Sequence, residues 1–387
     1  MRAMPAVAPA AIPTGRDIRL DLFRGLALWF IFLDHIPTNV VSWLTVRNYG
    51  FSDATEIFVF ISGYTAVIAY GRMMVRDGWP LAAARIARRV WQLYVAHILL
   101  FVAFTAQIAW VSTSKPSLIA EMQLLGLGDD PFRAVLEAAL LKFRPVNLDV
   151  LPLYILLLAS FPFALPALLR WPVGVVAASV VVYAATCHFV WNLPAYPGDK
   201  VWFFNPLAWQ VLFYIGAACA AGAPRLVWFD RWRSQLTVLA VLYLLCSGVI
   251  ALSWQYNPLG RLIPDWVGRL IYPIDKTNID VLRVIHFLAV AWLVRLMVPQ
   301  DARFLRWPLL RPLRRCGEHS LQIFCLGTFL ALSGQVVVSH YEDSIVSQIG
   351  VSIAGLLIMS AVAYGAAWYK RAPVKDSQRG VAREGIA

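Results

Sequence analysis

The feature that most constrains this chain is a series of apolar stretches of about 20 residues, the length that an α-helix needs to cross a bilayer. We identify ten of them, at residues 20–40, 52–71, 90–112, 148–169, 172–191, 205–222, 234–254, 279–298, 319–340 and 345–369. The composition agrees, because only 14% of the residues are charged, against about 25% in soluble domains. A water-soluble enzyme, a nucleic-acid-binding protein and a disordered regulator are therefore excluded. The sequence predicts an all-α polytopic membrane protein with about ten transmembrane helices.

Lysine and arginine are distributed unevenly between alternate loops. With the N terminus inside, the inner segments hold 23 of the 34 basic residues, the outer loops hold 9, and Arg24 and Arg283 lie within spans. Because cytoplasmic loops retain positive charge, this asymmetry predicts that both termini are cytoplasmic. We expect a cytoplasmic tail at 1–18, a single membrane domain at 19–370 and a second cytoplasmic tail at 371–387.

The fourth apolar stretch contains Pro152, Pro162 and Pro166. We expect a kinked helix, which a bilayer tolerates when neighbouring helices satisfy the carbonyl groups that proline leaves free. The five cysteines show no CxxC spacing, so we expect packing cysteines and neither a disulfide framework nor a metal site.

Ionisable residues within an apolar span are costly and are by default candidates for function. The first span concentrates them, with Asp21, Arg24, Asp34 and His35. Arg24 and His35 are eleven residues apart, so on a helix they share one face and lie about 16 Å apart along the axis. A structural ion pair between Asp21 and Arg24 is an alternative, but it leaves His35 unexplained. Asp34 cannot orient His35, since adjacent helical residues point about 100° apart.

Two other spans bring ionisable residues to the depth of this histidine. The second span begins with Asp53 and Glu56 on one face, and the eighth carries Asp280, Arg283 and His286 at i, i+3 and i+6. Both spans enter from the outside in the predicted orientation. We therefore expect a converged site in the outer third of the bilayer rather than unrelated buried charges.

Five segments carry a resemblance to a known family. They are DLFRGLALWFIFLDHIP (21–37), FSDATEIFVFISGY (51–64), RPVNLDVLPLYI (144–155), FFNPLAWQVLF (203–213) and DKTNIDVLRVIHFLA (275–289). In this order they resemble the OpgC family, whose members succinylate osmoregulated periplasmic glucans. Arg24 and His35 also match the Arg-x10-His pattern of the wider membrane acyltransferase family 3 superfamily. The resemblance extends over essentially the whole chain after residue 15.

This resemblance implies a transmembrane O-acyltransferase in the inner membrane of a Gram-negative bacterium. Such an enzyme moves an acyl group, here succinyl, from cytosolic acyl-CoA to hydroxyl groups of periplasmic glucans. Succinyl-CoA is then a co-substrate, with no permanently bound cofactor. The expected partners are the glucan, the acyl donor, membrane lipids and proteins of glucan synthesis, with no nucleic acid.

The resemblance also implies residue roles, with the acyl group passing between helices from Arg24 to His35. His35 is expected to act as the general base, oriented by Asp53 or Glu56. The expected catalytic residues are His35, Glu56, Asp53 and His286. The expected donor-binding residues are Arg24, Asp21, Arg283 and Lys276. The expected acceptor-binding residues are Asp34, Asn147, Asp149, Asn205, Gln210 and Asn278, with tryptophans of the outer loops beside them.

Three alternatives remain open at the level of the sequence. A transporter or flippase of a glycan precursor also uses membrane-buried charge, but it moves its substrate without changing its mass. A scaffold for a glucan synthase would tolerate the loss of His35. An acyltransferase with a different surface polysaccharide as acceptor is the nearest alternative within the enzyme class.

Overall fold

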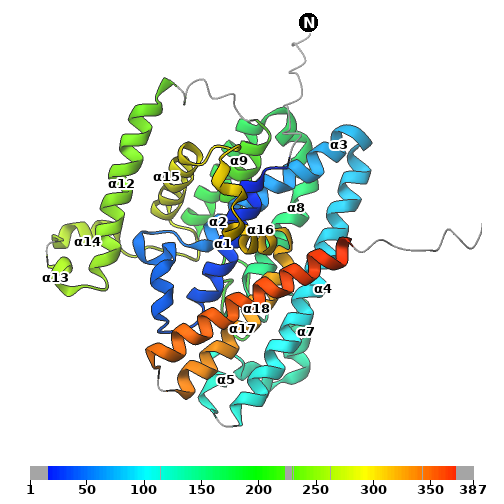
Figure 1. Ribbon diagram of the computed structural model, residues 1–387. Helices are drawn as coiled ribbons and strands as arrows, with labels where there is room; N and C mark the ends of the chain where they lie inside the picture. The colour runs from blue at the N-terminus through cyan, green and yellow to red at the C-terminus, as the bar shows by residue number, and fades with distance from the viewer. Residues whose placement is uncertain are drawn as a thin grey trace, which may run out of the picture.

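Each of the ten apolar stretches is helical in the computed structural model (Figure 1), which describes residues 16–113, 115–222, 229, 231–261, 263–341 and 343–371. Most of both predicted tails, residues 1–15 and 372–387, therefore lies outside the described residues. In chain order the helices that follow the ten stretches are α1 (Ile18–Asp34), α2 (Ala54–Ala66), α4 (Trp79–Ser112), α8 (Val150–Arg170), α9 (Pro172–Phe189), α10 (Pro206–Ala220), α12 (Arg233–Ser253), α15 (Val281–Met297), α17 (Ser320–His340) and α18 (Ile345–Arg371).

Shorter helices connect these elements. A π-helical turn (Val67–Gly71) extends α2 into α3, and the loops contain further short helices. They are α3 (Arg72–Asp77), α5 (Ser117–Glu121), α6 (Leu125–Asp129), α7 (Pro131–Ala139), α13 (Asn257–Gly260), α14 (Asp265–Ile271) and α16 (Arg311–Glu318), with 3-10 turns at Val40–Leu44, Val46–Tyr49, Arg303–Arg306 and Pro308–Leu310.

Seven helices of the described chain are long and apolar enough to cross a membrane: α2 with its extension to Asp77, α4, α8, α9, α12, α17 and α18. The other three, α1, α10 and α15, have 17, 15 and 17 residues. The all-α prediction is confirmed. The orientation with both termini in the cytoplasm stays a prediction.

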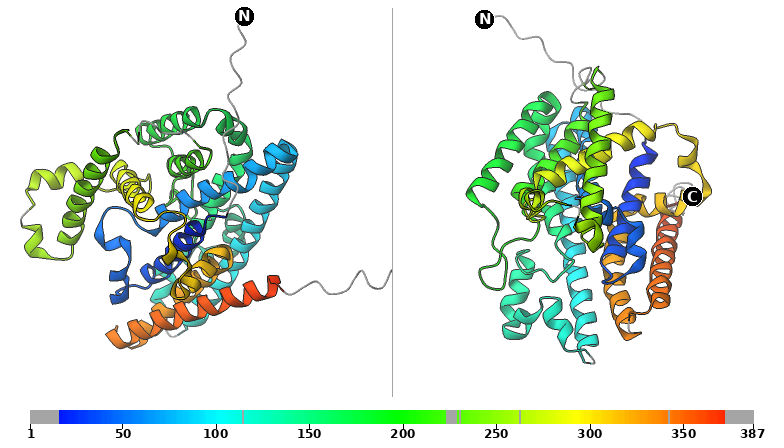
Figure 2. Two further views of the ribbon diagram at one scale, coloured as in Figure 1. Left: turned by 45° about the horizontal axis from the view of Figure 1, so that its top comes forward. Right: turned by 90° about the vertical axis from the view of Figure 1, so that its left-hand side faces the viewer.

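Helices α1 and α2 lie in the interior of the bundle, and α12 lies at its edge (Figures 1 and 2). Glycines let the central backbones approach closely. A Cβ atom at Gly25 would overlap the carbonyl oxygen of Leu313, and one at Gly317 would overlap that of Asp21. Helix α1 therefore packs on α16 backbone against backbone, as small residues allow between membrane helices.

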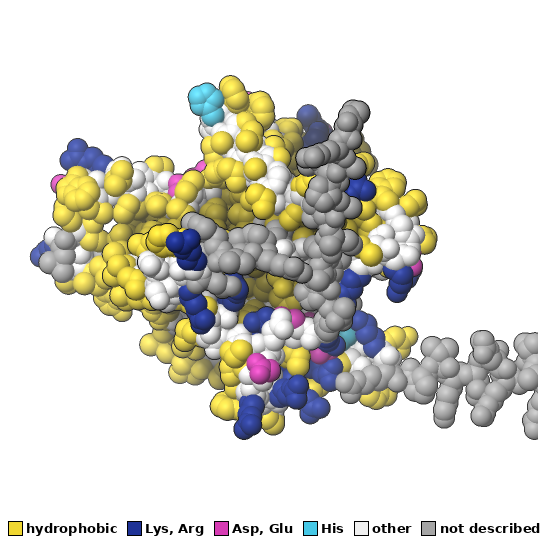
Figure 3. Space-filling model, turned by 90° about the horizontal axis from the view of Figure 1, so that it is seen from above, with side chains coloured by type: hydrophobic (Ala, Val, Ile, Leu, Met, Phe, Trp, Pro, Cys, Tyr) yellow, Lys and Arg dark blue, Asp and Glu magenta, His cyan; other side chains and the backbone are white. Residues whose placement is uncertain are grey.

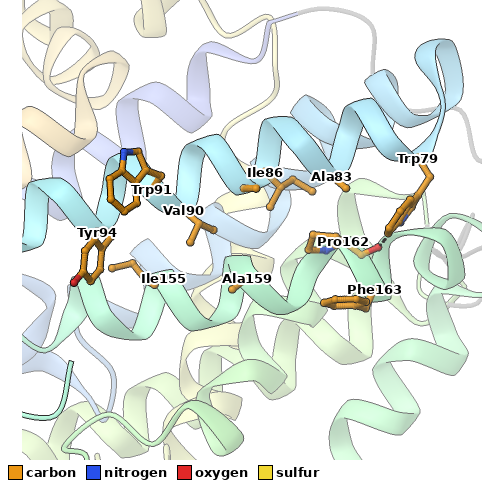
Figure 4. Close-up of a pocket in the computed structure, with 11 residues that line it drawn as sticks. Trp79, Ala83, Ile86, Val90, Trp91, Tyr94, Ile155, Ala159, Pro162 and Phe163 are labelled. Atoms are coloured by element: carbon orange, nitrogen blue, oxygen red, sulfur yellow. Dashed lines mark hydrogen bonds between the residues drawn. The ribbon is translucent and has the colours of Figure 1, made fainter. Parts of the chain in front are cut away.

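The prolines of α8 have the neighbour that the sequence predicts. Pro166 has no N–H group, so the carbonyl of Pro162 loses its helical partner. The indole Nε1 of Trp79 on α4 donates a hydrogen bond to this carbonyl at 2.9 Å. The contact lies at one end of an apolar groove of about 560 Å³ between α4 and α8 (Figure 4).

The two ends of the bundle differ in character. At one end, which we call the loop end, the segments 34–55, 122–150, 195–204 and 251–283 line a common cavity. Figure 3 looks onto the opposite end, where α1 begins, and shows many Lys and Arg side chains and few Asp and Glu side chains. We call this the basic end.

Candidate active site

The cavity at the loop end has a volume of about 930 Å³. This size suits a small-molecule or saccharide site. Half of the predicted site residues line it. These are His35, Asp34, Asp53, Asn147, Asp149, Lys276 and Arg283. The structure thus brings together residues from α1, the start of α2, the loop before α8 and the start of α15.

His35 follows the last residue of α1 and is half-buried at the cavity wall. Its ring nitrogen Nδ1 lies 2.5 Å from the carbonyl oxygen of Ile31, one turn earlier in the same helix. A carbonyl only accepts hydrogen bonds, so Nδ1 carries the proton, and Nε2 of the neutral ring keeps its lone pair. The group that orients His35 is therefore a backbone carbonyl, whereas the sequence suggested Asp53 or Glu56.

Asp53 and Glu56 form the capping box that begins α2. The Asp53 carboxylate accepts a hydrogen bond from the N–H of Thr55, and Glu56 accepts one from the N–H of Asp53 at 2.9 Å. This arrangement satisfies backbone groups that a helix start leaves free.

The same two carboxylates bind two cations. Lys276 Nζ lies 2.6 Å from Asp53, and Arg283 lies 3.2 Å from Asp53 and 2.6 Å from Glu56. We call these four residues the ion quartet. It joins the start of α2 to the start of α15, and its formal charges balance. Both cations expected to bind the donor thus already have carboxylate partners within the chain.

His286 lies behind the cavity rather than on its wall. It is 4% exposed, its Nδ1 is 2.7 Å from Ser52 Oγ, and its ring contacts Phe51. A Cβ atom at Gly50 would overlap the imidazole. The observed contacts of His286 therefore fix the segment 50–52, which leads into α2.

Arg24 and Asp21 lie deeper in the bundle, toward the basic end. Arg24 donates a hydrogen bond to Thr65 Oγ1 at 2.7 Å and has no carboxylate within ion-pairing distance among the described residues. Asp21 pairs with Arg16 at 2.8 Å, so the alternative ion pair between Asp21 and Arg24 is not observed.

Arg24 does not line the cavity, which reaches α1 only as far as Ile31. This cavity therefore does not extend along α1 to Arg24. Seven residues separate Arg24 from Ile31, which is about 10 Å along a helix.

Three of the predicted acceptor-binding residues are instead packed between helices. Asn205 caps α10 and donates to Asn278 at 2.8 Å, Asn278 also donates to Asp275, and Gln210 exchanges hydrogen bonds with Ser179. None of the three lines the cavity. The remaining ones do: Asp34 accepts from Thr45 at 2.7 Å, and Asp149 pairs with Arg144 at 2.9 Å.

The cavity also contains residues that the sequence did not single out. Trp254 and Tyr272 line it with ring centroids 5.9 Å apart, and Trp254 stacks on Phe51 at 6.3 Å. We call Phe51, Trp254 and Tyr272 the aromatic wall. The abundance of aromatic residues in the predicted outer loops was its only signal.

Arg47 and Gln335 are two of several further lining residues that the sequence did not indicate. Arg47 donates to the carbonyl of Asp34 at 3.0 Å, so it sits beside the residue that precedes His35. Gln335 of α17 reaches the cavity from within the bundle. An amide in an apolar helix and an arginine in a short loop carry no sequence pattern that marks them.

Comparison with known proteins gives the family of the chain. A family model described as OpgC protein matches residues 16–371. No curated protein and no solved structure matches the chain at a significant level. The match includes all five segments on which the resemblance rests, and it spans all of the described residues. This chain therefore belongs to the OpgC family.

Proposed function

We propose that this protein is an inner-membrane O-acyltransferase that moves a succinyl group from cytosolic succinyl-CoA to hydroxyl groups of periplasmic glucans. Family membership supports the reaction class. The loop end faces the periplasm and the basic end faces the cytoplasm in this proposal, in agreement with the distribution of Lys and Arg. The observation that carries the proposal is the placement of His35 on the wall of a large cavity with Nδ1 held by the Ile31 carbonyl.

His35 is suited to general-base catalysis, because its Nε2 lone pair is not used in a hydrogen bond among the described residues. The proton of a glucan hydroxyl moves to Nε2 while the hydroxyl oxygen bonds to the thioester carbon. A tetrahedral oxyanion forms. The carbon–sulfur bond then breaks, and the imidazolium returns its proton to the departing thiolate, which leaves as the free thiol of coenzyme A.

Arg24 is suited to an anionic part of the donor. A guanidinium stays charged even when buried and offers forked donors to phosphate or to a carbonyl oxygen. Arg24 is half-buried, a charge within a membrane bundle is costly without a counter-charge, and Thr65 supplies only a neutral hydroxyl. The donor supplies the missing negative charge. In this proposal the donor passes along α1 between Arg24 and Ile31 to reach the cavity.

The free carboxylate of a succinyl group needs a cation within the cavity. Lys276 and Arg283 are held in the ion quartet. Arg47 is a better candidate, because it donates its hydrogen bond to a neutral carbonyl, that of Asp34, next to His35. We therefore assign the recognition of the succinyl carboxylate to Arg47.

The glucan acceptor contacts the aromatic wall. Trp254 and Tyr272 are 47% and 45% exposed, whereas Phe51 behind them is 4% exposed. Aromatic rings at a membrane surface often anchor the protein in lipid, but these rings share a cavity with Asp53 and Lys276. These charged neighbours favour a hydrated sugar rather than lipid as the ligand of the cavity.

The test is mass spectrometry of periplasmic glucans from three strains. The first lacks this protein, the second carries the wild type and the third carries His35→Ala. The wild type is expected to add succinyl mass increments and to convert neutral glucans to anionic ones. His35→Ala is expected to abolish these increments while protein level and glucan amount stay normal.

Two outcomes contradict the proposal. A wild type that changes the location of a glycan without changing its mass indicates a transporter. Full acylation by His35→Ala removes this histidine from the mechanism.

A further inference from the structure

Gln335 projects from α17 into the same cavity as His35. It is only 9% exposed and lines the cavity although it belongs to the interior of the bundle. Helix α17 packs against α1, and a Cβ atom at the preceding residue, Gly334, would lie 3.2 Å from the side chain of Ile36. The amide therefore stands at the level of the α1 terminus, on the bundle side of the cavity.

The amide of Gln335 makes no hydrogen bond with the described part of the chain. The other two buried glutamines are both satisfied: Gln210 bonds to Ser179, and Gln348 accepts from the N–H of Val40 at 2.7 Å and donates to Asp343. The side chain of Gln335 is nine-tenths buried, while its amide group remains accessible from the cavity. An amide that lines a cavity and is not used by the protein itself can bind a ligand there.

We propose that Gln335 is a catalytic residue whose amide N–H groups bind the carbonyl oxygen of the acyl thioester. This inference rests on the proposed acyl transfer. As the glucan oxygen bonds to the thioester carbon, the carbon–oxygen π electrons move onto the carbonyl oxygen, and Gln335 donates to the resulting oxyanion. Those electrons re-form the carbonyl when the carbon–sulfur bond breaks.

The position of Gln335 fits the carbonyl oxygen better than the sugar. The aromatic wall and the loops occupy the outer part of the cavity, whereas Gln335 comes from a helix of the bundle, the direction from which the donor arrives. An uncharged amide stabilises negative charge that develops during the reaction without binding the ground state tightly.

The experiment measures succinyl transfer by purified full-length protein in lipid nanodiscs, with Gln335→Leu, Gln335→Glu and the wild type. Loss of one oxyanion donor lowers kcat by about 100- to 1,000-fold, so we expect such a fall for Gln335→Leu with little change in the KM of succinyl-CoA. Gln335→Glu keeps the shape but places a negative charge beside the oxyanion, and we expect it to be at least as impaired.

Gln107→Leu is the matched control. Gln107 lies on α4, donates to Ser333 of α17 at 2.6 Å and does not line the cavity. We expect this variant to keep its kcat.

Thermal unfolding separates catalysis from structure. Gln335→Leu removes no hydrogen bond within the described part of the chain, so we expect the unfolding temperature of the free protein to stay unchanged, whereas a structural role predicts a lower one. Turnover by Gln335→Leu within a few fold of the wild type would overturn the inference and leave the acyltransferase proposal intact. A wild type without acyl transfer would overturn both.

Discussion

Arg283 on α15 forms an ion pair with Glu56 on α2 at 2.6 Å, although 227 positions separate the two residues in the chain. Glu56 is fully buried and also accepts the backbone N–H of Asp53. The pair thus fixes the start of α2, and with it Asp53 on the cavity wall, to the start of α15.

Glu56→Leu is expected to destabilise the protein. Removing one partner of a buried ion pair leaves an uncompensated charge and costs about 3–5 kcal/mol. Thermal unfolding in nanodiscs measures this loss. The double variant Glu56→Leu, Arg283→Met is expected to recover part of it, because both charges are then gone. Equal stability of the Glu56→Leu variant and the wild type would contradict the structural role of the pair.

Arg24→Ala is expected to weaken donor binding. A lost hydrogen bond between charged groups is worth about 1.5–3 kcal/mol, which corresponds to roughly a 10- to 150-fold rise in the KM of succinyl-CoA. Steady-state kinetics at saturating glucan measure it. Arg76→Ala is the control, since Arg76 is exposed and pairs with its neighbour Asp77. An unchanged donor KM together with an unchanged kcat would show that Arg24 does not touch the donor.

Arg47→Gln is expected to change the choice of acyl group. Without its guanidinium the cavity loses the counter-ion proposed for the succinyl carboxylate, so the rate with succinyl-CoA should fall about tenfold or more relative to acetyl-CoA. The ratio of kcat/KM for the two donors measures this effect. Arg269→Gln, on exposed α14 and away from the cavity, should leave the ratio unchanged. Equal losses with both donors would place Arg47 outside acyl recognition.

Trp254→Ala is expected to raise the KM for the glucan and to leave the KM for succinyl-CoA near its wild-type value. Loss of an aromatic contact typically costs about 0.5–1.5 kcal/mol, or roughly 2- to 13-fold in affinity. Trp266→Ala is the control, because Trp266 is 66% exposed on nearby α14 but does not line the cavity. If both variants bind the glucan equally well, the aromatic wall serves a purpose other than acceptor binding.

The sequence predicted the helical part of the site better than its polar contacts. Helical geometry predicted Arg24 and His35 on one face of α1; in the structure Arg24 bonds to Thr65 of α2, and His35 lines the cavity that Ala54 and Thr55 also line. Which residues share a face of a helix depends only on their spacing within that helix, so the sequence alone predicts it.

The predicted acceptor-binding residues show that contacts between distant parts of the chain could not be predicted in this way. Asn205 stands before Pro206 at the start of α10, and an asparagine followed by proline is a common helix start. Its amide serves this backbone and Asn278 rather than the cavity. Whether the protein itself hydrogen-bonds to an amide depends on residues that are distant in the sequence. For the same reason the sequence could not indicate Gln335, to which no described residue hydrogen-bonds.

The glycines at the crossing of α1 and α16 determine on which side of α1 a path for the donor can form. At Gly25 and Gly317 the two backbones touch without intervening side chains, so neither helix can slide or tilt past the other without a clash. The inner half of α1, which carries Arg24, therefore behaves as one rigid body with α16. A path that admits the pantetheine chain would then form on the flank of α1 that packs against α2, where side chains can change rotamer and the main chain can stay in place.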